Sequence, residues 1–310
     1  MDLAQFCAQA RLLIVAGKGG VGKTTVSAAL ARLVARQGRT PLLIEIEGKS
    51  GLAAVFGGPA LNYETIELVA GSAQANPILA RALTPDLALL EYLETHGLRR
   101  LSKRLLSSGV LDVVATAVPG LKDLIVLSQI KKIERDTDAD VIIVDAPAAG
   151  HALTFLMSPR GLADAIRVGP IHSQATQVLE LLHDAERCQV VLVTLPEETP
   201  VTELIETAFA VEDRVGVALG PVVVNGCYPD HPSLERALRG GRPRGVSAED
   251  WDVLVRAAEF RGAREASQAQ QLTRLDAQLP LPRVQLPLLA TADLCLDDLD
   301  VLVDAALEAQ

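Results

Sequence analysis

The sequence predicts an α/β protein with a doubly wound, mostly parallel sheet. Short and nearly uninterrupted apolar runs, such as Leu12–Ala16 and Pro41–Glu47, are typical of strands that helices cover on both faces. A glycine-rich turn and a helical stretch, Val26–Arg36, follow the first run, which gives the order strand, loop, helix. The chain has 310 residues, 49% of them hydrophobic, and this is enough for one large domain with an inserted lobe.

Further apolar runs predict the rest of the sheet. We expect strands at residues 140–145, 189–194, 221–225 and 284–288. Helices are expected mainly over residues 75–118, after Pro119-Gly120 as far as Ile133, and over the long polar stretch at 247–278. The chain therefore alternates strands with helices, as a parallel sheet requires.

We predict one domain over residues 1–310, with a helical subdomain inserted at about residues 75–118. Part of residues 155–185 is a candidate extension of this subdomain. Within the insertion, Leu98, Leu101 and Leu105 recur at helical spacing with basic residues between them. This pattern fits a partner-binding face, and it also fits an ordinary amphipathic helix with a solvated basic side.

The segment Gly17–Thr25 has the pattern G-x-x-x-x-G-K-T of a phosphate loop. Because glycine has no Cβ, successive backbone amides can turn inward and line a concave site for phosphate oxygens. The helix that follows directs its positive end at the same place. The residues expected to bind the nucleotide here are Gly19, Gly20, Val21, Gly22, Lys23, Thr24 and Thr25.

Three side chains of this loop have predicted roles. Lys23 can reach the β- and γ-phosphates of a nucleotide as a point charge. The Thr24 hydroxyl can ligate Mg²⁺. Thr25 lies one step into the helix and can reach the α-phosphate. The cofactors expected from this loop are therefore Mg²⁺ and a nucleoside triphosphate.

Two other interpretations of the glycine loop remain. Gly17, Gly19 and Gly22 also satisfy G-x-G-x-x-G, the dinucleotide fingerprint, and Glu45 or Glu47 stands where a ribose-binding acid could stand. That fingerprint does not require the Lys-Thr pair, so the phosphate loop is favoured. The third interpretation is a glycine turn without a ligand.

Composition excludes several classes of protein. The net charge of −10 argues against broad nucleic-acid binding. The four cysteines, Cys7, Cys188, Cys227 and Cys295, are scattered without a C-x-x-C pair, so we expect neither a zinc nor an iron–sulfur site and interpret them as reduced core or near-core thiols. There is no signal peptide and no apolar run of ~18 residues, so a cytoplasmic location is expected.

Lys18 gives the loop a second distinguishing feature. The sequence Lys18–Thr24 resembles the deviant phosphate loop of dimeric ATPases, which include arsenite-pump ATPases, tail-anchored-protein-targeting factors, Min and Par ATPases and the nitrogenase iron protein. In those families this lysine contacts the phosphates that the other subunit binds. The resemblance therefore implies a catalytic role for Lys18 in a homodimer, or in a heterodimer with a paralogous ATPase. A solvated loop lysine is the alternative.

The end of the second predicted strand narrows the resemblance to the ArsA-type family of arsenical pump-driving and tail-anchored-protein-targeting ATPases, close to its single-domain actinobacterial branch. That family usually has Asp-Pro-Ala-His there, with the Asp placing the attacking water, whereas this chain has Glu47-Gly48-Lys49-Ser50. Glu47 is the candidate catalytic residue for that role. Since a misplacement of ~1 Å can lower a rate roughly a hundredfold, the departure suggests slow hydrolysis. An acid merely solvated at a strand end is the alternative.

The strand at residues 140–145 ends in Asp145, as a Walker-B-type strand ends in an acid. The turn Asp145–His151 resembles the family's switch II loop. By this resemblance, Asp145 holds Mg²⁺ together with Thr24, Gly150 senses the γ-phosphate and His151 relays that state. The alternatives are a helix cap for Asp145 and a packing role for His151.

The residues expected to bind the base of the nucleotide lie in the last third of the chain. The family has an asparagine at the end of the strand at 221–225, so Asn225 is expected to pair with adenine, which favours ATP. Pro287, in the last predicted strand, is expected to form the far wall of the base pocket.

The resemblance implies a dimeric Mg-ATP-dependent ATPase whose nucleotide cycle switches a client- or partner-binding helical lobe, either to target membrane proteins or to drive an efflux partner. One alternative is a slow or non-catalytic nucleotide-binding subunit that pairs with an active paralogue. A Min- or Par-type positioning ATPase is the other, and the acidic C-terminal stretch and net charge disfavour it. Only two methionines are present, which weighs against a client groove for varied apolar helices.

Overall fold

The computed structural model describes residues 3–46, 51–95, 119–147, 149–229, 236, 239–291 and 293–308. Its centre is a nine-stranded sheet in the order β3-β4-β2-β5-β1-β6-β8-β9, with β7 paired to β6. Only β3 is antiparallel to its neighbour; the other pairs are parallel. The strands are β1 (Leu12–Gly17), β2 (Pro41–Ile46), β3 (Ile66–Val69), β4 (Ile78–Leu83), β5 (Val141–Asp145), β6 (Cys188–Thr194), β7 (Ala218–Leu219), β8 (Val222–Cys227) and β9 (Arg283–Pro287).

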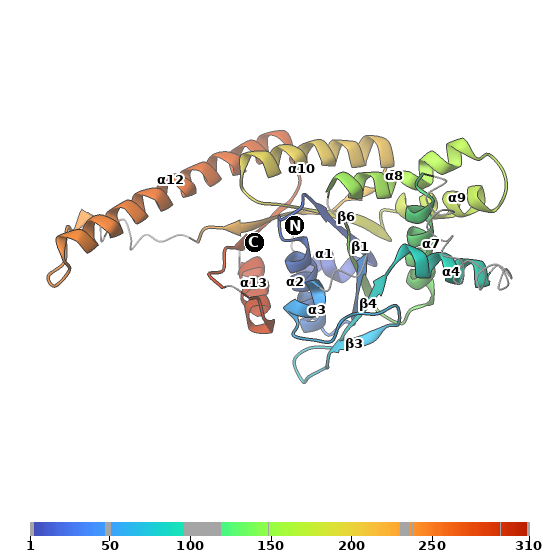
Figure 1. Ribbon diagram of the computed structural model, residues 1–310, viewed down its shortest axis with the longest axis horizontal. Helices are drawn as coiled ribbons and strands as arrows, with labels where there is room; N and C mark the ends of the chain where they lie inside the picture. Colours follow the sequence, from blue (N-terminus) through green and yellow to red (C-terminus); the bar gives the residue numbers. More distant parts are fainter. Residues whose placement is uncertain are drawn as a thin grey trace.

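Helices cover both faces of this sheet (Figure 1). They are α1 (Leu3–Gln9), α2 (Lys23–Arg36), α3 (Gly51–Val55), α4 (Pro85–Thr95), α7 (Leu121–Asp136), α8 (Ala149–Ala165), α9 (Pro170–Leu182), α10 (Glu198–Ala210), α12 (Ala248–Gln278) and α13 (Leu296–Glu308), with a π-helical turn at Val211–Val215. This confirms the predicted α/β class with a mostly parallel sheet.

The two faces of the sheet have separate cores because side chains alternate along each strand. In β1, Leu13 and Val15 pack with α1, α2 and α13, whereas Leu12 and Ile14 pack with α7, α8 and α9. All six residues of β1 are buried, which accounts for its uninterrupted apolar sequence. We refer to these as the α2 face and the α7 face.

β1 lies between β5 and β6, where the direction of the strand order changes. In an open α/β sheet, ligands bind at the carboxyl ends of the strands beside such a switch point. The glycine loop follows β1 directly, so the topology puts it at this position.

One predicted helical region is partly wrong. Residues 78–83 form β4, which pairs with β2, instead of belonging to an inserted helical segment. Ile78, Ala80 and Ala82 alternate with less buried neighbours, which is the period of a strand close to a sheet edge. The helix α4 begins at Pro85, within the range expected to be mainly helical. Residues 96–118, with Leu98, Leu101 and Leu105, lie outside the described residues.

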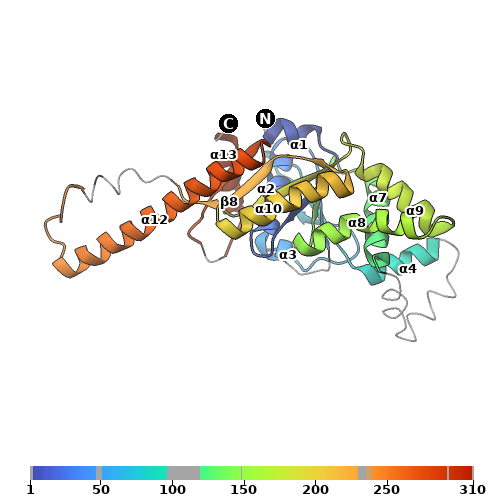
Figure 2. The ribbon, with the colours of Figure 1, turned by 90° about the horizontal axis from the view of Figure 1, so that it is seen from above.

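The helices α4, α7, α8 and α9 gather at one end of the molecule, and α12 projects from the other end (Figures 1 and 2). The predicted extension at 155–185 falls on α8 and α9, which pack against α7. The extent of an inserted subdomain stays a prediction. Of the helices in the described ranges, none combines the length and apolar character needed to cross a bilayer.

The expectation that all cysteines are core or near-core thiols is wrong for one of them. Cys7, Cys188 and Cys227 are buried, whereas Cys295 is exposed in the segment that leads into α13. Cys295 directly precedes Leu296, the first residue of α13, at the outer end of that helix.

Candidate functional site

The loop between β1 and α2 is shaped by glycines at close contacts. Gly20 and Gly22 have φ values of 87° and 88°, in the region that favours glycine. A Cβ at Gly22 would lie 2.2 Å from Asn225 Nδ2, and one at Gly17 would lie 2.3 Å from the carbonyl oxygen of Val193. The loop can pass this close to β6 and β8 only because these residues have no side chains.

The same loop leads directly into α2, whose first residue is Lys23 and whose N-cap is Gly22. The first amides of a helix have no partner within the helix, and its dipole favours an anion there. The Lys23 ammonium donates a hydrogen bond to the carbonyl of Lys18 at 3.1 Å, so it folds back across the loop. A strand, a glycine nest, a helix start and a cation are thus combined at one spot, which suits phosphate oxygens.

Thr24 and Asp145 meet beside this loop. The Thr24 hydroxyl donates to Asp145 Oδ2 at 2.7 Å, and Ser27 Oγ donates to Asp145 Oδ1 at 3.4 Å. Asp145 stands at the end of β5 and is 8% exposed. A hydroxyl beside a carboxylate supplies the hard oxygen ligands that Mg²⁺ prefers, so the donor set fits that ion.

Burial raises the pKa of Asp145. The hydrogen bond from Thr24 and the charge of Lys23 act in the opposite direction, and the nearby Glu45 raises the pKa further. The carboxylate is therefore held in a place where its charge is poorly solvated. A divalent cation would relieve this unfavourable burial, which is a second reason why the site fits Mg²⁺.

The geometry decides the role of Glu45. Its Oε1 accepts hydrogen bonds from the backbone amides of Gly51 at 2.9 Å and Leu52 at 3.4 Å, so it caps the start of α3. It is 3% exposed and lies opposite Asp145 in the register of β2 and β5. A buried cap is not available to a ribose hydroxyl, so the dinucleotide interpretation loses one of its two candidate acids.

Lys18 points away from the Lys23 cradle. Its ammonium lies 2.6 Å from Oε1 of Glu203 on α10, and the two side chains are 37% and 39% exposed. The contact joins the loop to a helix on the α7 face, 185 residues farther along the chain. Glu203 was not predicted, because nothing in its own sequence context distinguishes it from other acids of that helix.

The two residues predicted at the base of the nucleotide lie in one open pocket. Asn225 at the end of β8 and Pro287 at the end of β9 line it together with Thr25 of α2 and Leu288. The Asn225 amide also donates to the carbonyl of Val21 at 3.0 Å, so it supports the loop. A flat apolar wall with an amide at one side suits a purine ring.

For three of the predicted site residues, Glu47, Gly150 and His151, the structure does not describe a side-chain position. Glu47, with Gly48, Lys49 and Ser50, lies outside the described residues. The backbone of Gly150 and His151 belongs to the first turn of α8, soon after Asp145. The switch and water-placing roles therefore stay predictions.

Ser27 was missed by the sequence analysis, although a signal exists. It follows Thr24 by three residues on α2, so the two hydroxyls share one face of the helix. Elsewhere in the described ranges, no three His, Cys, Asp or Glu side chains cluster in a way that could hold a metal ion. The Thr24–Asp145 position is accordingly the candidate magnesium site.

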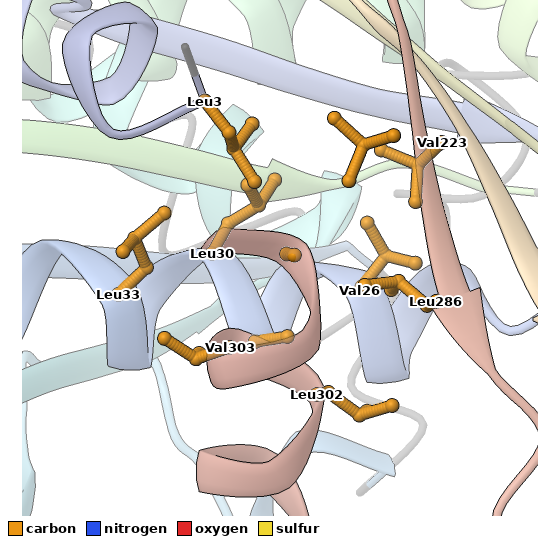
Figure 3. Close-up of a pocket in the computed structure, with 11 residues that line it drawn as sticks. Leu3, Val26, Leu30, Leu33, Val223, Leu286, Leu302 and Val303 are labelled. Atoms are coloured by element: carbon orange, nitrogen blue, oxygen red, sulfur yellow. The ribbon is translucent and has the colours of Figure 1, made fainter. Parts of the chain in front are cut away.

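A second, apolar pocket lies between α1, α2, α13 and the sheet (Figure 3). Leu3, Leu30 and Val303 point into it, and its lining contains only hydrophobic side chains. It is part of the core on the α2 face, and we assign it no ligand.

Comparisons with known proteins agree with this geometry. Residues 10–169 match the family model described as anion-transporting ATPase. The chain is 33% identical over 301 residues to ATPase BagA of Mycobacterium tuberculosis, with 89% of this chain and 87% of the relative covered. It is 25% identical over 309 residues to a Halobacterium salinarum protein named for an arsenical pump-driving ATPase, covering 94% and 43% of the two chains. It is 29% identical over 175 residues to ATPase get3 of Schizosaccharomyces japonicus, covering 54% and 52%.

Proposed function

This chain belongs to the anion-transporting ATPase family and is an ATP hydrolase, and we propose that it acts as a dimer whose two phosphate loops close on ATP and Mg²⁺. The observation that carries the proposal is the contact between Thr24 and Asp145 beside the glycine loop. The family membership supports ATP as the nucleotide, and the Asn225–Pro287 pocket supports adenine as its base.

Each part of the site has a proposed task. The amides of Gly19 to Gly22 and the ammonium of Lys23 bind the β- and γ-phosphates. Thr24 and Asp145 hold Mg²⁺, which when bound neutralises charge on the phosphate oxygens. Glu47 is proposed to place the attacking water, and Gly150 and His151 to transmit the state of the γ-phosphate.

Dimerisation is proposed from Lys18. Lys23 already spans the cradle of its own loop, whereas Lys18 is partly exposed on the outside of it. A second copy facing this loop would meet the Lys18 ammonium before any other cation of the site. When the dimer closes, the Lys18 ammonium would leave Glu203 and contact the phosphates of the nucleotide that the partner binds. The ATP-bound dimer would therefore be favoured over the separate chains.

The proposed output is conformational. The loop after β5 leads into α8, which packs on α7 and α9. A change at Asp145 and the first turn of α8 would therefore shift the helices that gather at this end of the molecule. We propose that these helices, with the neighbouring segment at 96–118, bind a membrane-protein client or a membrane partner.

The test is a comparison of lysine variants. Purified chain would be assayed for ATP turnover and, by light scattering, for mass with ATP and Mg²⁺, with ADP, and without nucleotide. Lys23→Ala should lose nucleotide binding, whereas Lys18→Ala should still bind ATP but neither dimerise nor turn over. Lys131→Ala, which removes a lysine from α7, is the matched control.

The outcome also decides between partners. A wild-type chain that doubles its mass with ATP supports a homodimer, whereas a chain that stays single and turns over slowly supports pairing with a paralogue. If Lys18→Ala dimerised and turned over normally, the proposed role of Lys18 would be wrong. Mass spectrometry of proteins retained when hydrolysis is blocked would identify the client.

A further inference from the structure

A polar cavity of about 250 Å³ lies on the α7 face, away from the phosphate loop. It is formed by β4, α4 and α7 and is lined by Thr65, Arg81, Glu91, Gln129, Lys132 and Asp136, among others. Arg81 pairs in register with Ile44, whose side chain belongs to the α7-face core. Asp145 pairs with Val15, which belongs to the α2-face core. The sheet therefore separates this cavity from the nucleotide site.

Arg81 is a half-buried cation that forms no salt bridge within the described residues, although the charge of the nearby Glu91 acts on it. Its guanidinium carbon lies 4.9 Å from the centre of the Tyr63 ring, which fixes the plane of the group. Its Nε is buried and makes no hydrogen bond, and none of the ion pairs among the described residues includes Arg81. Burial also lowers the pKa of Arg81. A planar donor held in this way is prepared for an acceptor that the chain itself does not supply.

Gln129, on α7, is a second polar side chain that can donate a hydrogen bond into this cavity. It is 6% exposed, yet its side-chain amide has no hydrogen bond within the described part of the chain, and it lines this cavity. Its amide is not among the buried polar atoms that lack a partner, so it reaches the cavity and can donate to a ligand there. The cavity therefore brings together a guanidinium and an amide that both lack acceptors.

The other charges around the cavity compensate one another. Glu91 forms an ion pair with Lys132 and accepts a hydrogen bond of 2.6 Å from the Tyr63 hydroxyl. Burial alone would raise the pKa of Glu91, but the hydrogen bonds from Lys132 and Tyr63 and the charges of Lys132 and Arg81 together outweigh it and lower that pKa. Asp136 pairs with Arg135 at 2.7 Å. The lining therefore holds two cations and two carboxylates, and among these four Arg81 is the one whose side chain makes no hydrogen bond or salt bridge within the described residues.

We propose that this cavity binds a small monocarboxylate, whose two oxygens accept hydrogen bonds from the Arg81 guanidinium and the Gln129 amide. A carboxylate matches the planar fork of arginine, which no acceptor of the described residues fills. Phosphate would bring excess negative charge close to Glu91 and Asp136. This site is independent of the proposed ATPase cycle.

The test is a titration of the whole chain with acetate, propionate and inorganic phosphate at constant ionic strength. Because anions could also enter the phosphate loop, the protein is first saturated with ADP and Mg²⁺, and the titration is repeated in the Lys23→Ala background. Binding is measured by calorimetry and by saturation-transfer NMR. The wild type should bind acetate and propionate saturably and bind phosphate more weakly.

The variants distinguish carboxylate binding in the cavity from a general effect of the protein's charge. Arg81→Met should weaken carboxylate binding at least tenfold, and Arg81→Lys should weaken it severalfold because lysine keeps the charge but lacks the fork. Gln129→Met should also weaken binding while leaving the melting temperature at or above that of the wild type, since it removes an unpaired amide. Arg242→Met, in an exposed loop, is the control and should bind as the wild type does.

If Arg81→Met fails to fold, the Arg81→Lys and Gln129→Met results decide. The proposal is overturned if the wild type binds no carboxylate, if phosphate binds more tightly than acetate, or if these variants bind with wild-type affinity. A melting temperature that falls in Gln129→Met with unchanged binding would assign Gln129 to structure alone.

Discussion

The ammonium of Lys18 lies 2.6 Å from Oε1 of Glu203 and joins the phosphate loop to α10 within one chain. Both side chains are more than a third exposed, so the pair is worth at most about 1 kcal/mol. It can therefore restrain Lys18 in the separate chain and still be exchanged at small cost when another anion is offered.

Replacing Glu203 should favour assembly. Glu203→Gln removes the competing partner of Lys18 in both chains, and we expect ATP-dependent dimerisation to become up to about 30-fold tighter, the equivalent of ~1 kcal/mol for each of the two pairs. Sedimentation equilibrium with ATP and Mg²⁺ measures this, and Glu206→Gln on the same helix is the control. Weaker dimerisation in Glu203→Gln would instead indicate that Glu203 acts in the closed dimer.

Asp145→Asn should abolish most of the turnover. The substitution keeps an acceptor for Thr24 but removes the charge of the proposed Mg²⁺ site. Losses on the order of 10²–10³ in rate are typical when one electrostatic group of a site is removed. ATP turnover at saturating Mg²⁺ tests this expectation. Asp138→Asn, an exposed aspartate shortly before β5, is the matched control. Near-normal turnover in Asp145→Asn would mean that the ion is held elsewhere.

Although Asp145→Asn should lower the turnover, it should raise the stability of the nucleotide-free protein at about pH 8. Burial raises the pKa of Asp145 above its ordinary value of 3.8, so the folded state binds the proton more tightly than the unfolded state. The contribution of protonated Asp145 to the stability of the folded protein is therefore complete below the ordinary pKa of 3.8. This contribution is lost as the pH rises through the pKa of Asp145 in the folded state. Asp145→Asn does not titrate, so it should equal the wild type at about pH 4 and exceed it at about pH 8. Melting temperatures across this range check the sign.

Gly22→Ala and Gly20→Ala form a matched pair. Both positions have φ near +88°, so alanine should be strained at each by about 1–2 kcal/mol. At Gly20 a Cβ meets nothing within 4 Å, whereas at Gly22 it lies 2.2 Å from Asn225 Nδ2. Denaturant unfolding should show a larger loss for Gly22→Ala, along with weaker nucleotide binding. Equal losses would mean that Asn225 moves aside freely.

The cysteines should differ in reactivity. Burial raises the pKa of Cys188 to about 12 and that of Cys227 to about 11, so the thiolate that reacts with alkylating agents is scarce at each. Cys295 is exposed. Iodoacetamide at about pH 8 should label Cys295 in the native protein and label Cys188 and Cys227 only after unfolding. Rapid native labelling of Cys188 would show that β6 opens readily.

The sequence by itself determined the features that depend on neighbouring residues. Gly17–Thr25 is predicted to bind phosphate because its glycines, Lys23 and Thr24 are close together in the sequence, and the buried strands are recognisable because helices cover them on both faces. Residues 78–83 were misassigned because a six-residue half-buried strand and a turn of helix have similar compositions at that length.

Only the tertiary structure decided which distant residues meet. Thr24 finds Asp145 through the register of β1 with β5, and Lys18 finds Glu203 because α10 packs beside the loop. Arg81 of β4 and Gln129 of α7 line the same cavity, although 48 residues separate them in the sequence. No local pattern contains these contacts, since a one-residue change of strand register would turn each side chain to the other face of the sheet.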